Sequence, residues 1–346
     1  MRKRFPVYGA AALLLAALVA LAFVLEDFQL FQLTMVMAYA VALLGLNMLV
    51  GYAGQISLGH GAFFALGGYA AAIFMNYVGL PYWAAVPLAG LFGFIFGFIF
   101  GIPTLRLQGH YLALATFSLA VATPQILKWK RIEDWTGGVQ GVLLNKPEPP
   151  AALAATPDQW LYLLALGVAA VLFTCAYRLL RGQVGRSIVA VRDHPIAAAA
   201  VGIDAARVKC LVFAVSALYT CVGGAVAAVA VQFVSPDTYN FFLSISLLVG
   251  VVVGGIETIS GAVAGAIFIQ FMPTLVGEYS KAAPWAIYGL ILMAVVFVAP
   301  GGVARVLRRR AGGASGRGRR ARPEEDTSLQ GDGSIQSKSM QRVPNS

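Results

Sequence analysis

Charged residues are scarce in this chain, at 12% of 346 residues, whereas a soluble globular protein typically has about a quarter. Hydrophobic residues make up 59%, and they recur in runs of about 20, long enough for a helix to cross a bilayer. Segments of about ten residues with alternating polarity, as in a membrane barrel, are missing. The sequence therefore predicts an all-α fold, a polytopic membrane helix bundle, and excludes an ordinary soluble protein.

Cysteine and histidine are also rare, with three residues of each. Cys175, Cys210 and Cys221 lie in or beside apolar segments, and their spacing fits neither a disulfide framework nor a zinc site. No stretch matches the phosphate-binding pattern G-x-x-x-x-G-K-[ST]. We therefore expect no metal and no cofactor in this chain.

Basic residues outnumber acidic ones, 25 to 15, but they are unevenly placed. Ten of them lie from Arg305 onward, in a segment of Gly, Ser, Arg, Glu and Gln that cannot bury enough apolar surface to fold. Positive charge beside a membrane attracts anionic lipid. We expect a transmembrane domain over residues 1–304 and a basic, disordered cytoplasmic tail over 305–346, with the lipid bilayer rather than nucleic acid as partner.

Apolar segments predict about ten transmembrane helices. They are Phe5–Leu25, Leu30–Val50, Gly61–Gly79, Trp83–Pro103, Tyr111–Leu127, Trp160–Leu180, Val208–Val231, Phe241–Gly254, Ile259–Val276 and Trp285–Ala299. The first is longer than the ~7–15 residues of a signal-peptide core, so we expect an uncleaved helix. With an even number of crossings, Lys and Arg clusters at 2–4, 178–209 and 305–310 predict cytoplasmic N- and C-termini. Lys128, Lys130 and Arg131 disagree, because this count places them outside.

Glycines recur every four residues in one bulky apolar segment, at Gly93, Gly97 and Gly101. This spacing aligns them on one face of a helix, where a neighbouring backbone can approach closely. The pattern predicts tight helix packing and says little about function.

The stretch GYAGQISLGHGAFFALGGY, residues 51–69, combines six glycines with three polar residues in apolar surroundings. Glycine weakens a helix, and Gln55, Ser57 and His60 can satisfy the backbone groups that a broken helix releases. Such backbone is tolerated at membrane depth only where it is buried in protein or lines a wet cavity. Two interpretations stay open, a break that lines a translocation pathway and a tight cytoplasmic turn before a closely packed helix.

A second glycine-rich stretch, GVVVGGIETISGAVAGA, carries the acidic residue Glu257. Ionisable side chains are costly within a membrane and usually serve function there. Glu257 is therefore a pathway candidate, and the alternative is a short cytoplasmic turn between two helices.

The long polar loop at 181–209 contains a short predicted helix, Ile196–Val201. Asp193 can cap its start, Pro195 suits its first turn, and Gly202 is placed to end it. Asp204 then caps the helix that re-enters the membrane. A helix of this length is marginal in water, so we expect it either to dock on another protein or to rest on lipid headgroups.

Four stretches of the chain carry a resemblance to a known family. Gly45–Ala72, Gly109–Ala120, Gly185–Asp204 and Phe233–Ala266 resemble, in this order, the LivM-type permease subunits of branched-chain amino-acid ABC importers. The resemblance runs from about Leu30 to Ala304. It implies a non-enzymatic subunit of the bacterial inner membrane that pairs with a second homologous permease, two cytoplasmic ATPases that bind ATP and Mg, and an external substrate-binding protein.

The resemblance also implies a role for the loop, since Arg192–Asp204 matches the segment that contacts the ATPase in such importers. The residues expected to couple to the ATPase are Arg192, Asp193, Pro195, Ile196, Ala197, Ala198, Ala199 and Gly202. Two positions depart from the family, where many relatives carry a Glu at Ser246 and a Gly-Ser pair at Glu257-Thr258. We therefore do not infer from the resemblance alone that the solutes are leucine, isoleucine and valine.

We expect a permease subunit for a small polar solute, most simply a branched-chain or related amino acid. The main alternative is a self-sufficient transporter or channel coupled to protons through His60, His110 or Glu257. A more distant one is an intramembrane enzyme that uses His60 with Ser57, against which no neighbouring carboxylate or second histidine is available.

Overall fold

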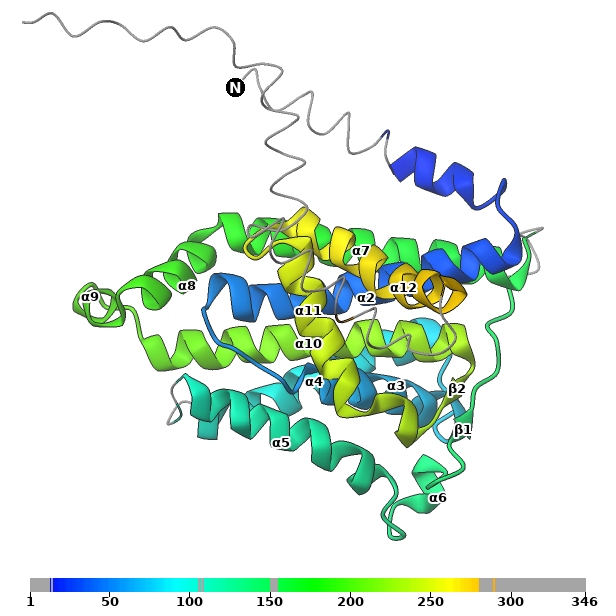
Figure 1. Ribbon diagram of the computed structural model, residues 1–346, viewed down its shortest axis with the longest axis horizontal. Coiled ribbons are helices and arrows are strands. Elements are labelled where there is room, and N and C mark those ends of the chain that lie inside the picture. Colours follow the sequence, from blue (N-terminus) through cyan, green and yellow to red (C-terminus); the bar gives the residue numbers. More distant parts are fainter. Residues whose placement is uncertain are drawn as a thin grey trace, which may run out of the picture. The chain divides into compact units, whose positions relative to one another are not determined.

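The computed structural model describes residues 13, 15–104, 107, 109–149, 155–279 and 289, and it is predominantly helical (Figure 1). The helices are α2 (Asp27–Asn47), η1 (Met48–Tyr52, a π-helix), α3 (His60–Asn76), α4 (Tyr82–Thr104), α5 (His110–Leu127), α6 (Glu133–Thr136), α7 (Pro157–Arg181), α8 (Gln183–Asp193), α9 (Pro195–Ala200), α10 (Ala205–Val231), η2 (Pro236–Tyr239, a 3-10 helix), α11 (Phe241–Gly254) and α12 (Ile259–Tyr279). Two short strands, β1 (Val142–Leu143) and β2 (Phe233–Val234), pair antiparallel with Val142 opposite Val234. The predicted all-α class is confirmed.

Five helical segments are long and apolar enough to cross a membrane. They are Asp27–Tyr52, Tyr82–Pro103, His110–Leu127, Pro157–Arg181 and Ala205–Val231, and the shorter apolar helices Phe241–Gly254 and Ile259–Leu275 accompany them. Each agrees with a predicted segment to within a few residues. The predicted first helix is described in part, and residues 13 and 15–21 are helical. Residues 5–12 and 14, all but one residue of the predicted last helix and the whole tail lie outside the described residues, so the count of about ten remains a prediction.

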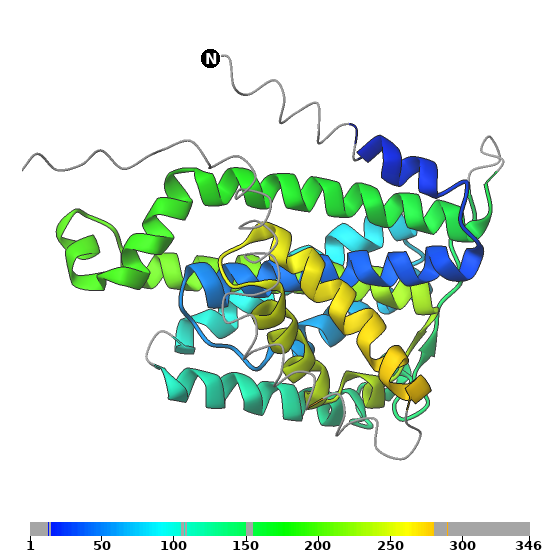
Figure 2. The ribbon, with the colours of Figure 1, turned by 45° about the horizontal axis from the view of Figure 1, so that its top comes forward.

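Helix α10 forms the centre of the bundle, where it packs against α2, α3 and α4 (Figure 2). In the most apolar 18-residue stretch of α10, 83% of the residues are buried, whereas the corresponding share in α7 is 22%. The glycines of α4 explain how α10 comes so close, because a Cβ at Gly97 would lie 2.5 Å from the Cβ of Ala217 and one at Gly93 would lie 2.6 Å from the Cβ of Cys221. The predicted close packing of this helix face is confirmed.

The cluster Lys128, Lys130 and Arg131, which disagreed with the predicted orientation, lies just after α5. Lys128 forms an ion pair there with Asp237 of η2. One of the three positive charges is thus paired with a residue that is distant in sequence.

Helix α3 begins inside the bundle rather than at its surface. Its first residue, His60, contacts Ser216 of α10, and Ser216 in turn bonds to Gly45 of α2. Ser216 is eleven residues after the start of α10 at Ala205, which is about 16 Å along the helix axis. After η1 the chain therefore runs back along α10 before α3 starts, as the blue trace in Figure 1 shows. The chain therefore does not form a tight surface turn that leads directly into a helix.

Candidate functional site

The interruption between α2 and α3 begins with a widened helical turn. Met48–Tyr52 is a π-helix, a feature that often marks functional sites. The amide of Gln55 donates to the carbonyl of Leu49 at 3.1 Å, and Gly54 adopts a φ of +67°, which favours glycine. Residues 53–59 then form neither helix nor strand. This interruption, residues 53–59, is the predicted break, now placed within the bundle.

Side chains of α5, of α11 and of the interruption itself bind the backbone of the interruption and of the first turn of α3. The amide of Leu58 donates to Oγ1 of Thr116 on α5 at 3.0 Å, and that of Gly61 donates to Oγ of Ser244 on α11 at 2.9 Å. The amide of Gly59 donates to Oγ of Ser57 at 3.3 Å. The prediction that polar side chains satisfy the released groups is confirmed for Ser57. Thr116 and Ser244 were not predicted, because isolated hydroxyl residues in apolar helices give no distinctive pattern.

The imidazole of His60 is fully buried and uses both of its nitrogens. Nδ1 lies 2.8 Å from Oγ of Ser57, and Nε2 lies 2.7 Å from Oγ of Ser216. The Ser216 hydroxyl donates to the carbonyl of Gly45 at 2.7 Å, so it accepts from Nε2–H of the ring. Nδ1 then accepts from Ser57. His60 therefore ties the start of α3 to α2 and α10, which is a structural role.

Gln55 differs from its two polar neighbours. Its side chain is 9% exposed, and its Nε2 has no hydrogen-bond partner among the described residues. A buried amide without a partner costs free energy, and such groups call for an explanation. Of the three polar residues predicted in this stretch, Gln55 alone has a buried side-chain donor without a partner among the described residues.

The loop between α7 and α10 contains two helices, α8 and α9. The predicted short helix is confirmed as α9, with Ile196 87% and Val201 76% exposed, while Ala198 is buried. The stop at Gly202 is confirmed as well, since its φ is +84° and its amide donates to the carbonyl of Ala199 at 3.0 Å.

The two capping predictions for this loop have different outcomes. Oδ1 of Asp204 accepts from the amides of Ala206 and Arg207 at 3.0 and 3.1 Å, as predicted for the start of α10. The cap by Asp193 is wrong, because the N-cap position of α9 is His194, which makes no side-chain cap bond. Asp193 is the last residue of α8, and its Oδ1 accepts from Nε of Arg192 at 2.9 Å. The neighbouring guanidinium competes successfully for that carboxylate.

Arg192 connects the loop to the interruption and to Glu257. Its Nη1 donates to the carbonyl of Gly51 at 2.9 Å and also bonds to Oε1 of Glu257. Bonds to the carboxylates of Asp193 and Glu257 raise the pKa of Arg192 above its usual value, so the guanidinium stays charged. Arg192 and Glu257, predicted for two separate roles, thus meet in one place.

Glu257 lies in the turn between α11 and α12, in agreement with the simpler of its two interpretations. Its φ is +64°, uncommon for a residue with a side chain. Three hydrogen bonds, two from Asn47 of α2 and one from Tyr52 of η1, hold the turn. Asn47 accepts from the amide of Glu257 at 3.0 Å and donates to the carbonyl of Thr258 at 2.8 Å, and the Tyr52 hydroxyl donates to the carbonyl of Glu257 at 2.8 Å. Asn47 and Tyr52 were not predicted, although an Asn within an apolar run is a signal.

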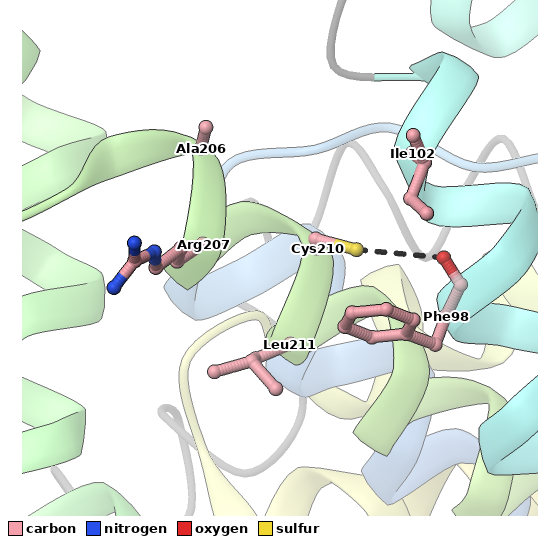
Figure 3. A pocket seen from close by; sticks show the side chains of 6 residues that line it. All are labelled: Phe98, Ile102, Ala206, Arg207, Cys210 and Leu211. Atoms are coloured by element: carbon pink, nitrogen blue, oxygen red, sulfur yellow. Dashed lines mark hydrogen bonds between the residues drawn. The ribbon is translucent and has the colours of Figure 1, made fainter.

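Two grooves near α10 do not involve the predicted residues. The groove of Figure 3, about 390 Å³, lies between α4 and α10, and Sγ of Cys210 donates to the carbonyl of Phe98 across it at 3.5 Å. Its lining is apolar apart from Arg207. A second groove of about 310 Å³ runs along α7, α8 and α10 and is also mainly apolar. Among the described residues, no group of three His, Cys, Asp or Glu could hold a metal ion.

Comparison with known proteins connects this architecture to transport. Residues 29–299 match the family described as branched-chain amino acid transport system / permease component. The chain is 30% identical over 288 residues to the high-affinity branched-chain amino acid transport system permease protein LivM of Salmonella typhimurium and to that of Escherichia coli, covering 76% of this chain and 67% of each relative. It is 30% identical over 174 residues to the autoinducer 2 import system permease protein LsrC of Klebsiella pneumoniae, covering 47% of this chain and 48% of that protein.

No solved structure matches the chain significantly. The family match covers most of the sequence, including α2 to α12, the interruption and the α8–α9 loop. The several apolar helices fit a protein that passes through a membrane more than once. The chain belongs to the family of branched-chain amino acid transport system permease components.

Proposed function

We propose that this chain is the permease subunit of an ATP-binding-cassette importer that moves branched-chain amino acids or related small polar solutes across the membrane. The family supports the transport role, and the names of the LivM relatives support the solute class. The observation that carries the coupling part of the proposal is helix α9, a short helix that turns two large apolar side chains outward.

Helix α9 is the proposed contact with a partner ATPase. Ile196 and Val201 are exposed at its two ends, and such side chains suit a groove on another protein better than water. The residues proposed for ATPase coupling are Arg192, Asp193, Pro195, Ile196, Ala197, Ala198, Ala199 and Gly202. Closure of the ATPases would displace α9 as a rigid body and bias the bundle between two states.

The translocation pathway is proposed to pass the interruption. Gln55 supplies a buried amide with no partner among the described residues, as a polar solute would require. Ser57 and His60 hold the non-helical backbone in place, and Glu257 fixes the turn after α11. Gln55 is therefore the proposed contact with solute, and the other three residues are proposed to shape the pathway around it.

The proposal requires partners that supply energy and solute. These are a second homologous permease, two cytoplasmic ATPases that bind ATP and Mg, and an external substrate-binding protein. The N- and C-termini and the α8–α9 loop are proposed to be cytoplasmic, in the inner membrane of a bacterium.

The test is uptake by proteoliposomes that contain the chain assembled with its candidate partners. We expect uptake of radiolabelled leucine, isoleucine or valine only when ATP is inside with the ATPases and the binding protein is present. The alternative, a self-sufficient transporter, predicts uptake by the isolated chain driven by a pH gradient without ATP. That result would refute the proposal.

A further inference from the structure

Three segments that are far apart in the sequence meet at the side chain of Arg192. One is the loop, in which Arg192 lies in the last turn of α8 beside Asp193, just before α9. Another is η1, directly after α2, whose Gly51 carbonyl accepts from Nη1 at 2.9 Å. The third is the α11–α12 turn, whose Glu257 carboxylate accepts from the same nitrogen. We infer that Arg192 is the positioning residue through which a displacement of α9 moves the interruption of the bundle.

This inference rests on the proposed function and adds a physical route to it. A guanidinium has five donors in a fixed planar arrangement, so it can hold two or three partners in one geometry. The flexible ammonium of a lysine would act as a single point charge there. The hydrogen bond to Asp193 orients the group from its own helix, which leaves Nη1 for the two partners on other segments.

Gly54 of the interruption lets Arg192 approach, and Gly51 of η1 lets the α11–α12 turn approach. A Cβ at Gly54 would lie 2.9 Å from Cγ of Arg192, and a Cβ at Gly51 would lie 2.8 Å from the amide of Glu257. The stem of Arg192 therefore packs directly on the chain that leads to α3. A displacement of α8 would therefore act on the interruption through van der Waals contact as well as through the hydrogen bonds and ion pair of Arg192.

The ion pair between Arg192 and Glu257 is the weaker part of the junction. The side chains of Arg192 and Glu257 are 25% and 43% exposed, so solvent weakens their attraction. Asn47 and Tyr52, in contrast, bind only backbone groups of the α11–α12 turn and keep it on the end of α2. The turn therefore stays fixed to the end of α2 and to η1, and its attachment does not depend on the Arg192–Glu257 pair.

The first experiment measures solute imported per ATP hydrolysed by the assembled transporter in proteoliposomes. For Arg192→Met we expect a fall of about tenfold or more in this ratio, with ATP hydrolysis within about twofold of the unmodified protein. For Glu257→Gln we expect a smaller fall, about threefold, because the bond to Gly51 remains. The matched control is Arg207→Met, since Arg207 lies in the first turn of α10, just after the loop, and its ion pair among the described residues is a local one, with Asp204 at 3.0 Å.

Exchanging the charges of Arg192 and Glu257 tests whether Arg192 acts by positioning its partners or only by supporting the fold. The variant with both Arg192→Glu and Glu257→Arg should import at least about threefold more solute per ATP than Arg192→Glu alone. An unchanged ratio in Arg192→Met, or no rescue by the exchange, would overturn the inference. If the unmodified assembly shows no ATP-driven uptake, the proposed function fails instead.

A distance measurement provides a readout that is independent of activity. Spin labels at the exposed positions Arg186 on α8 and Ile56 in the interruption report whether the two segments move together. On ATP binding we expect the distance to stay constant in the unmodified assembly and to change in Arg192→Met. The same response in both proteins would contradict a role for Arg192 in transmission.

Discussion

The interruption at residues 53–59 and the loop around α9 are both breaks in helical structure, yet they are built in opposite ways. The interruption lies against other helices, and side chains of α5 and α11, together with its own Ser57, satisfy backbone amides of residues 58–61. The loop caps itself locally, through Gly202 and Asp204, and turns Ile196 outward. Both regions use glycine and short polar side chains. In the interruption these residues are hydrogen-bonded inside the bundle, whereas in the loop they cap helices and leave α9 exposed.

The largest expected effect comes from filling the space beside the interruption. A Cβ at Gly61 would lie 2.9 Å from the backbone nitrogen of Ser244, so Gly61→Val must push α3 away from α11. We expect about 3 kcal/mol of destabilisation and little folded protein, measured by thermal unfolding in detergent. The control is Gly167→Val, because nothing lies within 4 Å of a Cβ at Gly167. Equal stability of the two variants would show that the interruption is not tightly enclosed.

A bulky side chain on α9 should leave the fold intact and stop transport. Ala199 is exposed, so Ala199→Trp changes the surface proposed to meet the ATPase without entering the core. We expect ATP-driven uptake to fall at least about tenfold, with an unchanged unfolding temperature. Val139→Trp, at an exposed site far from the loop in sequence, serves as the control. Normal uptake in Ala199→Trp would remove α9 from the proposed interface. Ala198 is less suitable for this test because it is buried.

Removal of the free amide in the interruption should affect solute more than folding. Gln55→Leu deletes a buried donor that has no partner among the described residues, so stability should stay equal or rise slightly. We expect the KM for solute uptake to rise several-fold. Tyr69→Phe removes the other buried side-chain group without a described partner and provides the comparison. An unchanged KM in Gln55→Leu would reduce Gln55 to a packing residue.

The smallest expected effect lies in the cap of α10. Asp204→Ala removes the acceptor for the amides of Ala206 and Arg207, which should cost about 1 kcal/mol of stability. Asp204→Asn keeps an acceptor and should cost less. Both are measured by thermal unfolding, and a loss in Asp204→Asn as large as that in Asp204→Ala would assign the effect to charge rather than to capping.

Prediction from the sequence succeeded where a structure depends on neighbouring residues. The bounds Phe241–Gly254 agree with α11, because an apolar run and a terminal glycine define them locally. Gly202 and Asp204 behave as predicted for the same reason. Asp193 was misassigned, since the adjacent Arg192 binds the carboxylate that a helix start would otherwise use.

The sequence by itself determined that this protein is an apolar helical bundle with a glycine-rich break and a capped polar loop, because hydrophobic periodicity and capping act over a few residues. Only the tertiary structure decided that α3 starts within the bundle and that Arg192 meets Glu257, 65 residues away. Contacts of this kind depend on how whole helices pack side by side. Glycine spacing permits such close packing but does not specify which helices meet.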